Sequence, residues 1–234
     1  MKIEIWSDIM CPFCYIGKRR LESALESFEY KDHVKIEWKS FLLNPDMKTD
    51  PEKSTLEYLS ETKGWSWEQT QQITKQVVEM AEGEGLTYRM ENTVVANAKN
   101  AHRLLQLSKT LEKGDAMKER LLSAYFTEGK NIDDLNTLIS LASEVGIEKE
   151  RAQACLESNE FAAKVEQDIL ESRQIGVRGV PFFVLDRKFG ISGAQPVEVF
   201  QDTLNKAWED YVKENPILQM NSSEGSSCDI NGNC

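Results

Sequence analysis

The chain has 234 residues, 40% hydrophobic and 29% charged, which is typical of a globular protein long enough to build a sizeable core. Its formal net charge of −11 disfavours nucleic acid and anionic membranes as partners, because like charges repel. No apolar run approaches the roughly 20 residues that span a bilayer. Glu4 and Asp8 also interrupt the stretch that would be apolar in a signal peptide. We therefore expect a cytoplasmic protein, whose five cysteines are kept reduced and do not form a structural disulfide framework.

The N-terminal elements form a strand–helix–strand unit. Residues 2–7 alternate polar and apolar side chains with the period of a strand. From Cys11 the apolar period becomes helical, and residues 34–42 again have the character of a strand. This order predicts two parallel strands joined by a right-handed helical crossover.

The middle of the chain is predicted to be helical. From about residue 51 to residue 158 we find no strand pattern. Apolar residues with helical spacing occur at 73–81, 94–111, 117–126 and 135–145.

Strand character returns near the C-terminus. After a helix at about 159–174, residues 182–185 and 188–191 predict a hairpin, and Pro196 opens a last helix. The Asn/Ser/Gly-rich residues 221–234 predict a flexible tail. The element order therefore indicates an α/β fold: a small mixed sheet domain from residues 1–44 and 159–215, a helical insertion domain at 45–158, and a C-terminal tail at 216–234.

The most informative motif is Cys11-Pro12-Phe13-Cys14, at the junction of the first strand and helix. Free N–H groups and the helix dipole at a helix N-terminus stabilise an anion, so we expect a lowered pKa and a nucleophilic thiolate at Cys11. Cys14, one turn further along the helix, suits a resolving thiol. A zinc site is the alternative, but it needs about four ligands and no other Cys or His has paired spacing near this motif. A C-x-x-C on a βαβ unit favours thioredoxin-type redox chemistry and no bound metal.

A second feature is Gly179-Val180-Pro181-Phe182, directly before a buried strand. In a thioredoxin fold a cis-proline loop lies against the redox cysteines. Only about 5–6% of X–Pro bonds are cis, so the local sequence alone does not predict a cis bond. The order of the elements does, and we therefore expect Pro181 to be that cis-proline.

These motifs resemble the DsbA-like thioredoxin superfamily, and most closely its FrnE-type predicted dithiol–disulfide isomerases. The resemblance is carried by residues 6–17, 176–184 and 191–196 and extends to about residue 212. It implies Cys11 as nucleophile, Cys14 as resolving thiol and Pro181 as cis-proline. It also implies substrate contacts at Pro12, Phe13 and Val180, where the Val180 backbone would pair with a bound peptide.

The sequence departs from two related branches. The periplasmic oxidases have His where this chain has Phe13, so we expect a less oxidising pair here. The related 2-hydroxychromene-2-carboxylate isomerases and kappa-class glutathione transferases usually have serine at the position of Cys11, which favours dithiol chemistry in this chain.

Four further residues are secondary candidates. Asp8 could tune the thiolate or cap a turn, and His102 could assist the site or be a hydrogen-bonded core residue. Cys228 and Cys234, separated by five residues, could form a second redox pair, a feature that FrnE-type proteins share.

Three functions stay open at this point. The leading hypothesis is an enzyme that reduces or isomerises disulfides of proteins or small thiols, with no tightly bound cofactor. The second is glutathione-linked isomerisation or transfer on an aromatic small molecule, with glutathione as co-substrate. The third is a redox-sensitive adaptor that brings partner proteins together. The oligomeric state is not predicted.

Overall fold

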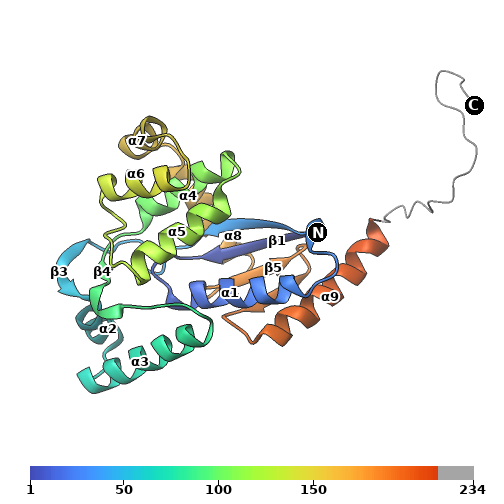
Figure 1. Ribbon diagram of the computed structural model, residues 1–234, viewed down its shortest axis with the longest axis horizontal. Helices are drawn as coiled ribbons and strands as arrows, with labels where there is room; N and C mark the ends of the chain where they lie inside the picture. The colour runs from blue at the N-terminus through green and yellow to red at the C-terminus, as the bar shows by residue number, and fades with distance from the viewer. Residues whose placement is uncertain (216–234) are drawn as a thin grey trace, which may run out of the picture.

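The computed structural model describes residues 1–215, and Figure 1 shows how its elements are arranged. No helix in this part of the chain is long and apolar enough to cross a membrane. The strands are β1 (Lys2–Ser7), β2 (Lys35–Ser40), β3 (Asp50–Ser54), β4 (Val94–Val95), β5 (Phe182–Leu185) and β6 (Phe189–Ser192). The α-helices are α1 (Pro12–Glu26), α2 (Thr55–Lys63), α3 (Trp67–Gly83), α4 (Lys99–Thr110), α5 (Gly114–Phe126), α6 (Leu135–Glu144), α7 (Lys149–Glu157), α8 (Ala162–Gln174) and α9 (Val197–Glu214).

The main sheet has four strands in the order β2-β1-β5-β6. β1 and β2 are parallel, as the strand–helix–strand pattern predicts, whereas β5 is antiparallel to both β1 and β6. The predicted hairpin is also present, and its two turn residues, Asp186 and Arg187, both have positive φ angles. Positive φ at both central residues matches the twist of a tight hairpin.

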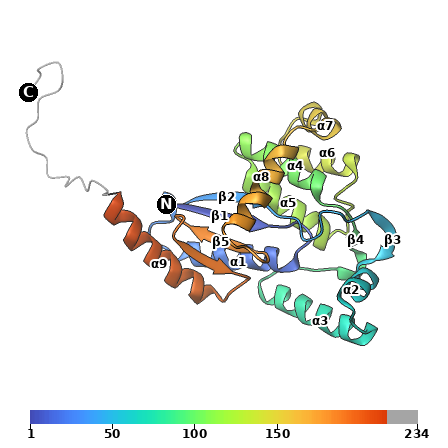
Figure 2. The ribbon, with the colours of Figure 1, turned by 180° about the vertical axis from the view of Figure 1, so that it is seen from behind.

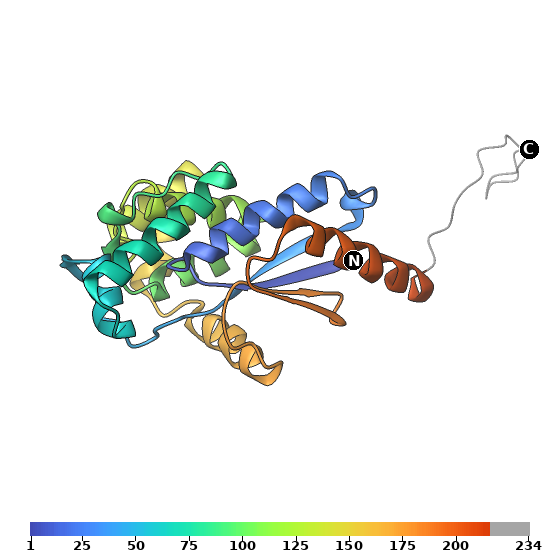
Figure 3. The ribbon, with the colours of Figure 1, turned by 90° about the horizontal axis from the view of Figure 1, so that it is seen from below.

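Helices cover both faces of this sheet. Figure 3 shows α1 and α9 together on one side of the strands and α8 on the other. The central strand β1 is therefore enclosed, and its side chains at Ile3, Ile5 and Trp6 are fully buried. In Figure 2, α8 lies in front of the sheet, beside the helices α4 to α7.

The segment between β2 and α8 is mostly helical, with two differences from the sequence prediction. A short antiparallel pair, β3 with β4, interrupts it, although no strand pattern is visible there. β4 has only two residues, too few for a period to show, and β3 reads Asp-Pro-Glu-Lys-Ser, which lacks the apolar alternation of a strand. The predicted helix at 94–111 accordingly begins later, at Lys99.

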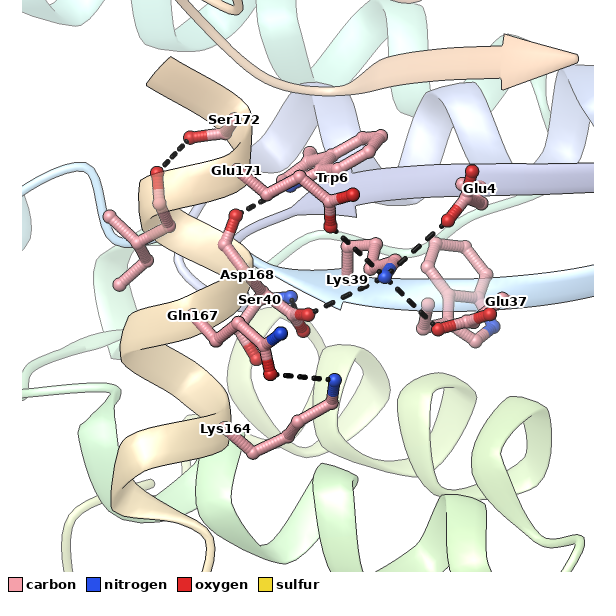
Figure 4. Close-up of polar contacts among 12 residues, drawn as sticks. Glu4, Trp6, Glu37, Lys39, Ser40, Lys164, Gln167, Asp168, Glu171 and Ser172 are labelled. Atoms are coloured by element: carbon pink, nitrogen blue, oxygen red, sulfur yellow. Dashed lines mark hydrogen bonds and ion pairs between the residues drawn. The ribbon is translucent and has the colours of Figure 1, made fainter. Parts of the chain in front are cut away.

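Beneath α8, a charge network crosses the sheet (Figure 4). The ammonium of Lys39, on β2, lies 3.2–3.6 Å from carboxylate oxygens of Glu4, Glu37, Asp168 and Glu171. The alternation in β1 suggests a solvent-facing side for Glu4, yet its side chain is only 1% exposed. Burial is tolerated here because the carboxylate has cationic partners.

The network also fixes α8 in place. The Asp168 Oδ2 atom accepts hydrogen bonds from the Ser40 backbone N–H at 2.9 Å and from Gln106 Nε2 at 2.6 Å. The backbone oxygen of Asp168 accepts a third hydrogen bond from the indole of Trp6, at 2.8 Å. One residue of α8 is therefore bonded to β1, β2 and α4.

Candidate active site

The two motif cysteines lie where β1 ends and α1 begins. Cys11 is the N-cap residue, with extended backbone angles, and Pro12 occupies the first helical position. Proline is suited to this position because its missing N–H would have no partner there. The backbone N–H of Cys14 donates to the Cys11 carbonyl at 3.0 Å, which closes the first turn. Both side chains are buried, with Cys11 4% and Cys14 1% exposed.

The predicted proline loop lies against these cysteines. The Val180–Pro181 peptide bond is cis, the geometry expected from the element order. The Sγ atom of Cys11 donates to the carbonyl oxygen of Val180 at 3.3 Å. Val180, Pro181 and Cys11 thus form one site, although Val180 follows Cys11 by 169 positions in the chain.

A glycine in α1 makes the close approach of the proline loop possible. A Cβ atom on Gly17 would lie 3.0 Å from Cγ of Pro181 and 3.1 Å from Cζ of Phe183. Those distances are shorter than ordinary van der Waals contacts, so any larger residue would push the loop away from α1.

Burial and neighbouring groups shift the pKa values of both thiols. The hydrogen bond to Cys14 and burial raise the pKa of the Cys11 thiol well above its ordinary value. At Cys14 burial also opposes ionisation, but interactions with the Cys11 sulfur and with the charge of Lys118 lower the pKa. The pair therefore holds one negative charge more readily than two, because a thiolate at either sulfur opposes ionisation of the other.

Asp8 and His102 are brought together beside the motif. The Asp8 carboxylate accepts from the backbone N–H of Met10 at 3.3 Å and of Leu43 at 2.8 Å, and it lies 3.3 Å from His102 Nε2. Asp8 therefore caps the turn before Cys11, as one of its two predicted roles requires. Burial lowers the pKa of His102. The pKa of Asp8 is lowered too, because the hydrogen bonds from His102 and Leu43 outweigh its burial.

The most informative residue that sequence reasoning missed is Lys118, on α5. Its side chain is fully buried, and its ammonium has no hydrogen-bond partner among residues 1–215. Burial lowers its pKa to about 8, while Cys14, Asp8 and Cys11 act in the opposite direction. No motif marks this lysine. The only sequence signal is its place in the apolar stripe of a helix, between Met117 and Leu121.

Other side chains of the helical segment hold the motif. The Tyr88 hydroxyl donates to the Pro12 carbonyl at 2.7 Å, and its ring stacks on Phe126 at a centroid distance of 4.6 Å. Glu119, next to Lys118, accepts from the hydroxyl of Tyr15 at 2.5 Å. The segment inserted between β2 and α8 thus contributes directly to the geometry around Cys11 and Cys14.

A cavity of about 290 Å³ opens beside the motif. Met10 and Pro12, which flank Cys11, contribute to its lining, most of which is apolar. Three methionines, Met10, Met47 and Met90, contribute to the lining, and flexible thioethers adapt to occupants of different shape. A larger cavity of about 440 Å³, between α4 and α8, is lined by no residue of the motif.

Two further expectations from the sequence concern a zinc site and the tail cysteines. Among the described residues, no group of three or more Cys, His, Asp or Glu side chains is arranged to hold a metal, so the alternative of a zinc site gains no support from them. Cys228 and Cys234 lie outside residues 1–215, and their pairing stays a prediction.

Comparisons with known proteins agree with this geometry. The DSBA-like thioredoxin domain family matches residues 2–205. The chain belongs to this family. A crystal structure of a probable DsbA oxidoreductase from Streptomyces coelicolor is 35% identical, with a TM-score of 0.84 over 99% of this chain and 97% of that one. The uncharacterized protein YwbO of Bacillus subtilis is 27% identical over 87% of this chain and 95% of its own.

A second solved structure shares the fold at lower identity. The cytosolic disulfide reductase DsbM of Pseudomonas aeruginosa, solved with GSH, is 17% identical, with a TM-score of 0.64 over 89% of this chain and all of its own. The expected thioredoxin fold with helical content inserted into it is confirmed, and so is membership of a thiol–disulfide oxidoreductase family.

Proposed function

We propose that this DsbA-like protein reduces or isomerises disulfides in the cytoplasm, with Cys11 as nucleophile and Cys14 as resolving thiol. The observation that carries the proposal is the Cys11 sulfur at a helix N-cap, 3.3 Å from the carbonyl of the residue before a cis-proline. The family membership and the cytosolic neighbour DsbM support the reaction class and the compartment.

The reaction proceeds by two exchanges. With the negative charge of the pair on Cys11, the Cys11 thiolate attacks a substrate disulfide. A Cys11–substrate disulfide forms, and one substrate thiolate leaves. In reduction, Cys14 next attacks the Cys11 sulfur, which releases the second substrate thiol and leaves a Cys11–Cys14 disulfide. In isomerisation, a second substrate thiol attacks instead and the pair stays reduced.

The substrate is held by backbone pairing and by an apolar contact. The backbone of Val180 pairs with the chain on one side of the substrate cysteine, as in strand addition. The cavity beside Pro12 receives an apolar side chain close to that cysteine, with Phe13, 38% exposed, at the approach. Substrates are therefore disulfides of proteins or peptides with a neighbouring apolar residue.

Replacement of each cysteine tests the assignment. Cys11→Ser should abolish turnover of a disulfide substrate, whereas Cys14→Ser should accumulate mixed disulfides that reducing agents release. A Cys155→Ser variant is the control, because that thiol is buried in α7, outside the motif. Full turnover without Cys11 would exclude the proposed mechanism.

The cavity beside Pro12 also favours a second function, glutathione-linked isomerisation of an aromatic compound. Glutathione would then bind as a co-substrate and raise the melting temperature of the Cys11→Ser variant, which cannot form a mixed disulfide there. If glutathione leaves that temperature unchanged, this function is excluded.

The tail cysteines are proposed as a second redox pair that exchanges electrons with Cys11 and Cys14. A Cys228→Ser/Cys234→Ser variant should then regain its reduced state more slowly after each turnover. Wild-type rates in both reduction and isomerisation would exclude this role.

A further inference from the structure

The cavity of about 440 Å³ between α4 and α8 has no part in the proposed reaction. Its volume lies in the range of about 300–1,000 Å³ that is usual for small-molecule sites. Leu42 and Pro45, in the segment after β2, line this cavity. Their neighbours Leu43 and Asn44 line the cavity beside Pro12, and the two cavities share no lining residue. The larger cavity is therefore a separate candidate site.

One wall of this cavity is a single face of α8. The lining residues of α8 recur at the spacing of neighbouring helical turns, at positions 162, 165, 166, 169, 170 and 173. They cover about 16 Å of the helix at roughly 1.5 Å per residue. Apolar side chains predominate among them, and the large hydrophobic side chain of Leu170 is 55% exposed. The cavity is thus an elongated apolar groove between two helices that lie side by side (Figure 2), and we call it the α4–α8 groove.

The charged side chains of the α4–α8 groove are mostly cationic. Lys99, Arg103 and Arg173 line it, and Glu166 is the acidic residue among its lining. Within residues 1–215 none of these three cations forms an ion pair, whereas a cation such as Arg120 has carboxylate partners. The formal net charge of the whole chain is −11, so the groove is a local excess of positive charge that attracts an anion.

Arg103 is a fixed cation in this groove. Its side chain is buried, and its N–H groups donate to neutral oxygen atoms only. Four of these acceptors are backbone carbonyls between residues 155 and 160, at the connection of α7 and α8. Lys99, one helical turn before Arg103 on α4, is exposed and donates no side-chain hydrogen bond in the described part of the chain. Its ammonium is therefore free to bind a ligand beside a second positive charge.

We propose that the α4–α8 groove binds an amphipathic carboxylate, with the carboxylate at Lys99 and the acyl chain along Val165, Ile169 and Leu170. One free ammonium beside a fixed cation suits a single negative charge at one end of the ligand. Glu166, on the same stripe of α8, opposes a second negative charge further along. The site uses neither motif cysteine, so its failure would leave the proposed redox function untouched.

The test is isothermal titration calorimetry of the full chain with decanoate, below its micellar concentration, and with decanol, which has the same chain and no charge. Octanoate should bind about tenfold more weakly than decanoate, because it lacks two methylenes that the groove would bury. Lys99→Glu should weaken decanoate binding by about tenfold or more and leave decanol binding unchanged. This variant should fold, because glutamate is favourable at a helix N-terminus. Lys63→Glu is the matched control, since it reverses a charge in the other cavity, and it should leave decanoate binding unchanged.

Two further variants test the acyl chain and the charge separately. Leu170→Gln should weaken decanoate and decanol alike by about fivefold, whereas Ile175→Gln, at a residue that is 41% exposed and outside the groove, should weaken neither. Glu166→Gln removes the opposing charge and should strengthen decanoate binding only, which keeps the proposal falsifiable if Lys99→Glu does not fold. Absence of saturable binding, equal affinities for decanoate and decanol, or equal losses in Lys99→Glu and Lys63→Glu would overturn the proposal.

Discussion

Replacement of Lys118 by Met should make the reduced protein more stable at about pH 7. Burial lowers the pKa of Lys118 from 10.5 to about 8. Each pKa unit corresponds to about 1.4 kcal/mol, so the folded state loses about 3 kcal/mol by keeping this amine charged. Met has a similar length and no charge, and the variant should regain about 2–3 kcal/mol of unfolding free energy.

The stability gained by Lys118→Met should depend on pH. Between pH 8 and 10.5 the unfolded chain holds a proton on Lys118 that the folded chain has lost. The unfolding free energy of the wild type should therefore rise with pH across that window. The advantage of Lys118→Met should be full below about pH 8 and should disappear above about pH 10.5, where the amine becomes neutral in both states.

Urea unfolding followed by tryptophan fluorescence, at several pH values with a reducing agent present, measures this difference. The same comparison in a Cys11→Ser/Cys14→Ser background removes the titration of the two thiols. There the gain should be at least as large, because the anions that support the lysine charge are absent. A variant that is less stable than its parent at about pH 7, or a gain that is the same at every pH, would refute the reasoning.

Three further replacements have defined outcomes. Gly17→Ala should lower the unfolding free energy by about 1–3 kcal/mol and slow turnover, because its Cβ would press on Pro181. Gly83→Ala, at a solvent-exposed position, is the control, and equal effects of the two variants would contradict the close approach of Gly17 to Pro181. Tyr88→Phe removes the hydrogen bond to the Pro12 carbonyl and should lower the unfolding free energy by about 1 kcal/mol. It should also lower the rate of disulfide exchange in stopped-flow measurements, and an unchanged rate would mean that this hydrogen bond does not hold the motif. Asp168→Ala leaves two buried donors unpaired and should lower the unfolding free energy by about 2–4 kcal/mol, and a loss below about 0.5 kcal/mol would show that α8 is held by other contacts.

Local sequence was sufficient to predict the strand and the helix that position the two sulfurs. The change from a strand period to a helical period at Cys11 placed the pair at a helix N-terminus, because both patterns depend on neighbouring residues only. The hairpin after Pro181 was also predictable, since its two strands are adjacent in the chain. The two-residue strand β4 was not, because its pairing depends on a partner about 40 residues away.

The electrostatics of the site were decided by tertiary structure. Lys118 and Cys14 come from helices about 100 residues apart, and Asp8 meets His102 across 94 residues. A charge, a burial or a close contact made over such distances leaves no periodic pattern in either segment. The sequence by itself therefore determined which atoms can exchange electrons, whereas the packing of the helical segment decided which charged groups surround the two sulfurs, because a pKa depends on burial and on neighbouring charges.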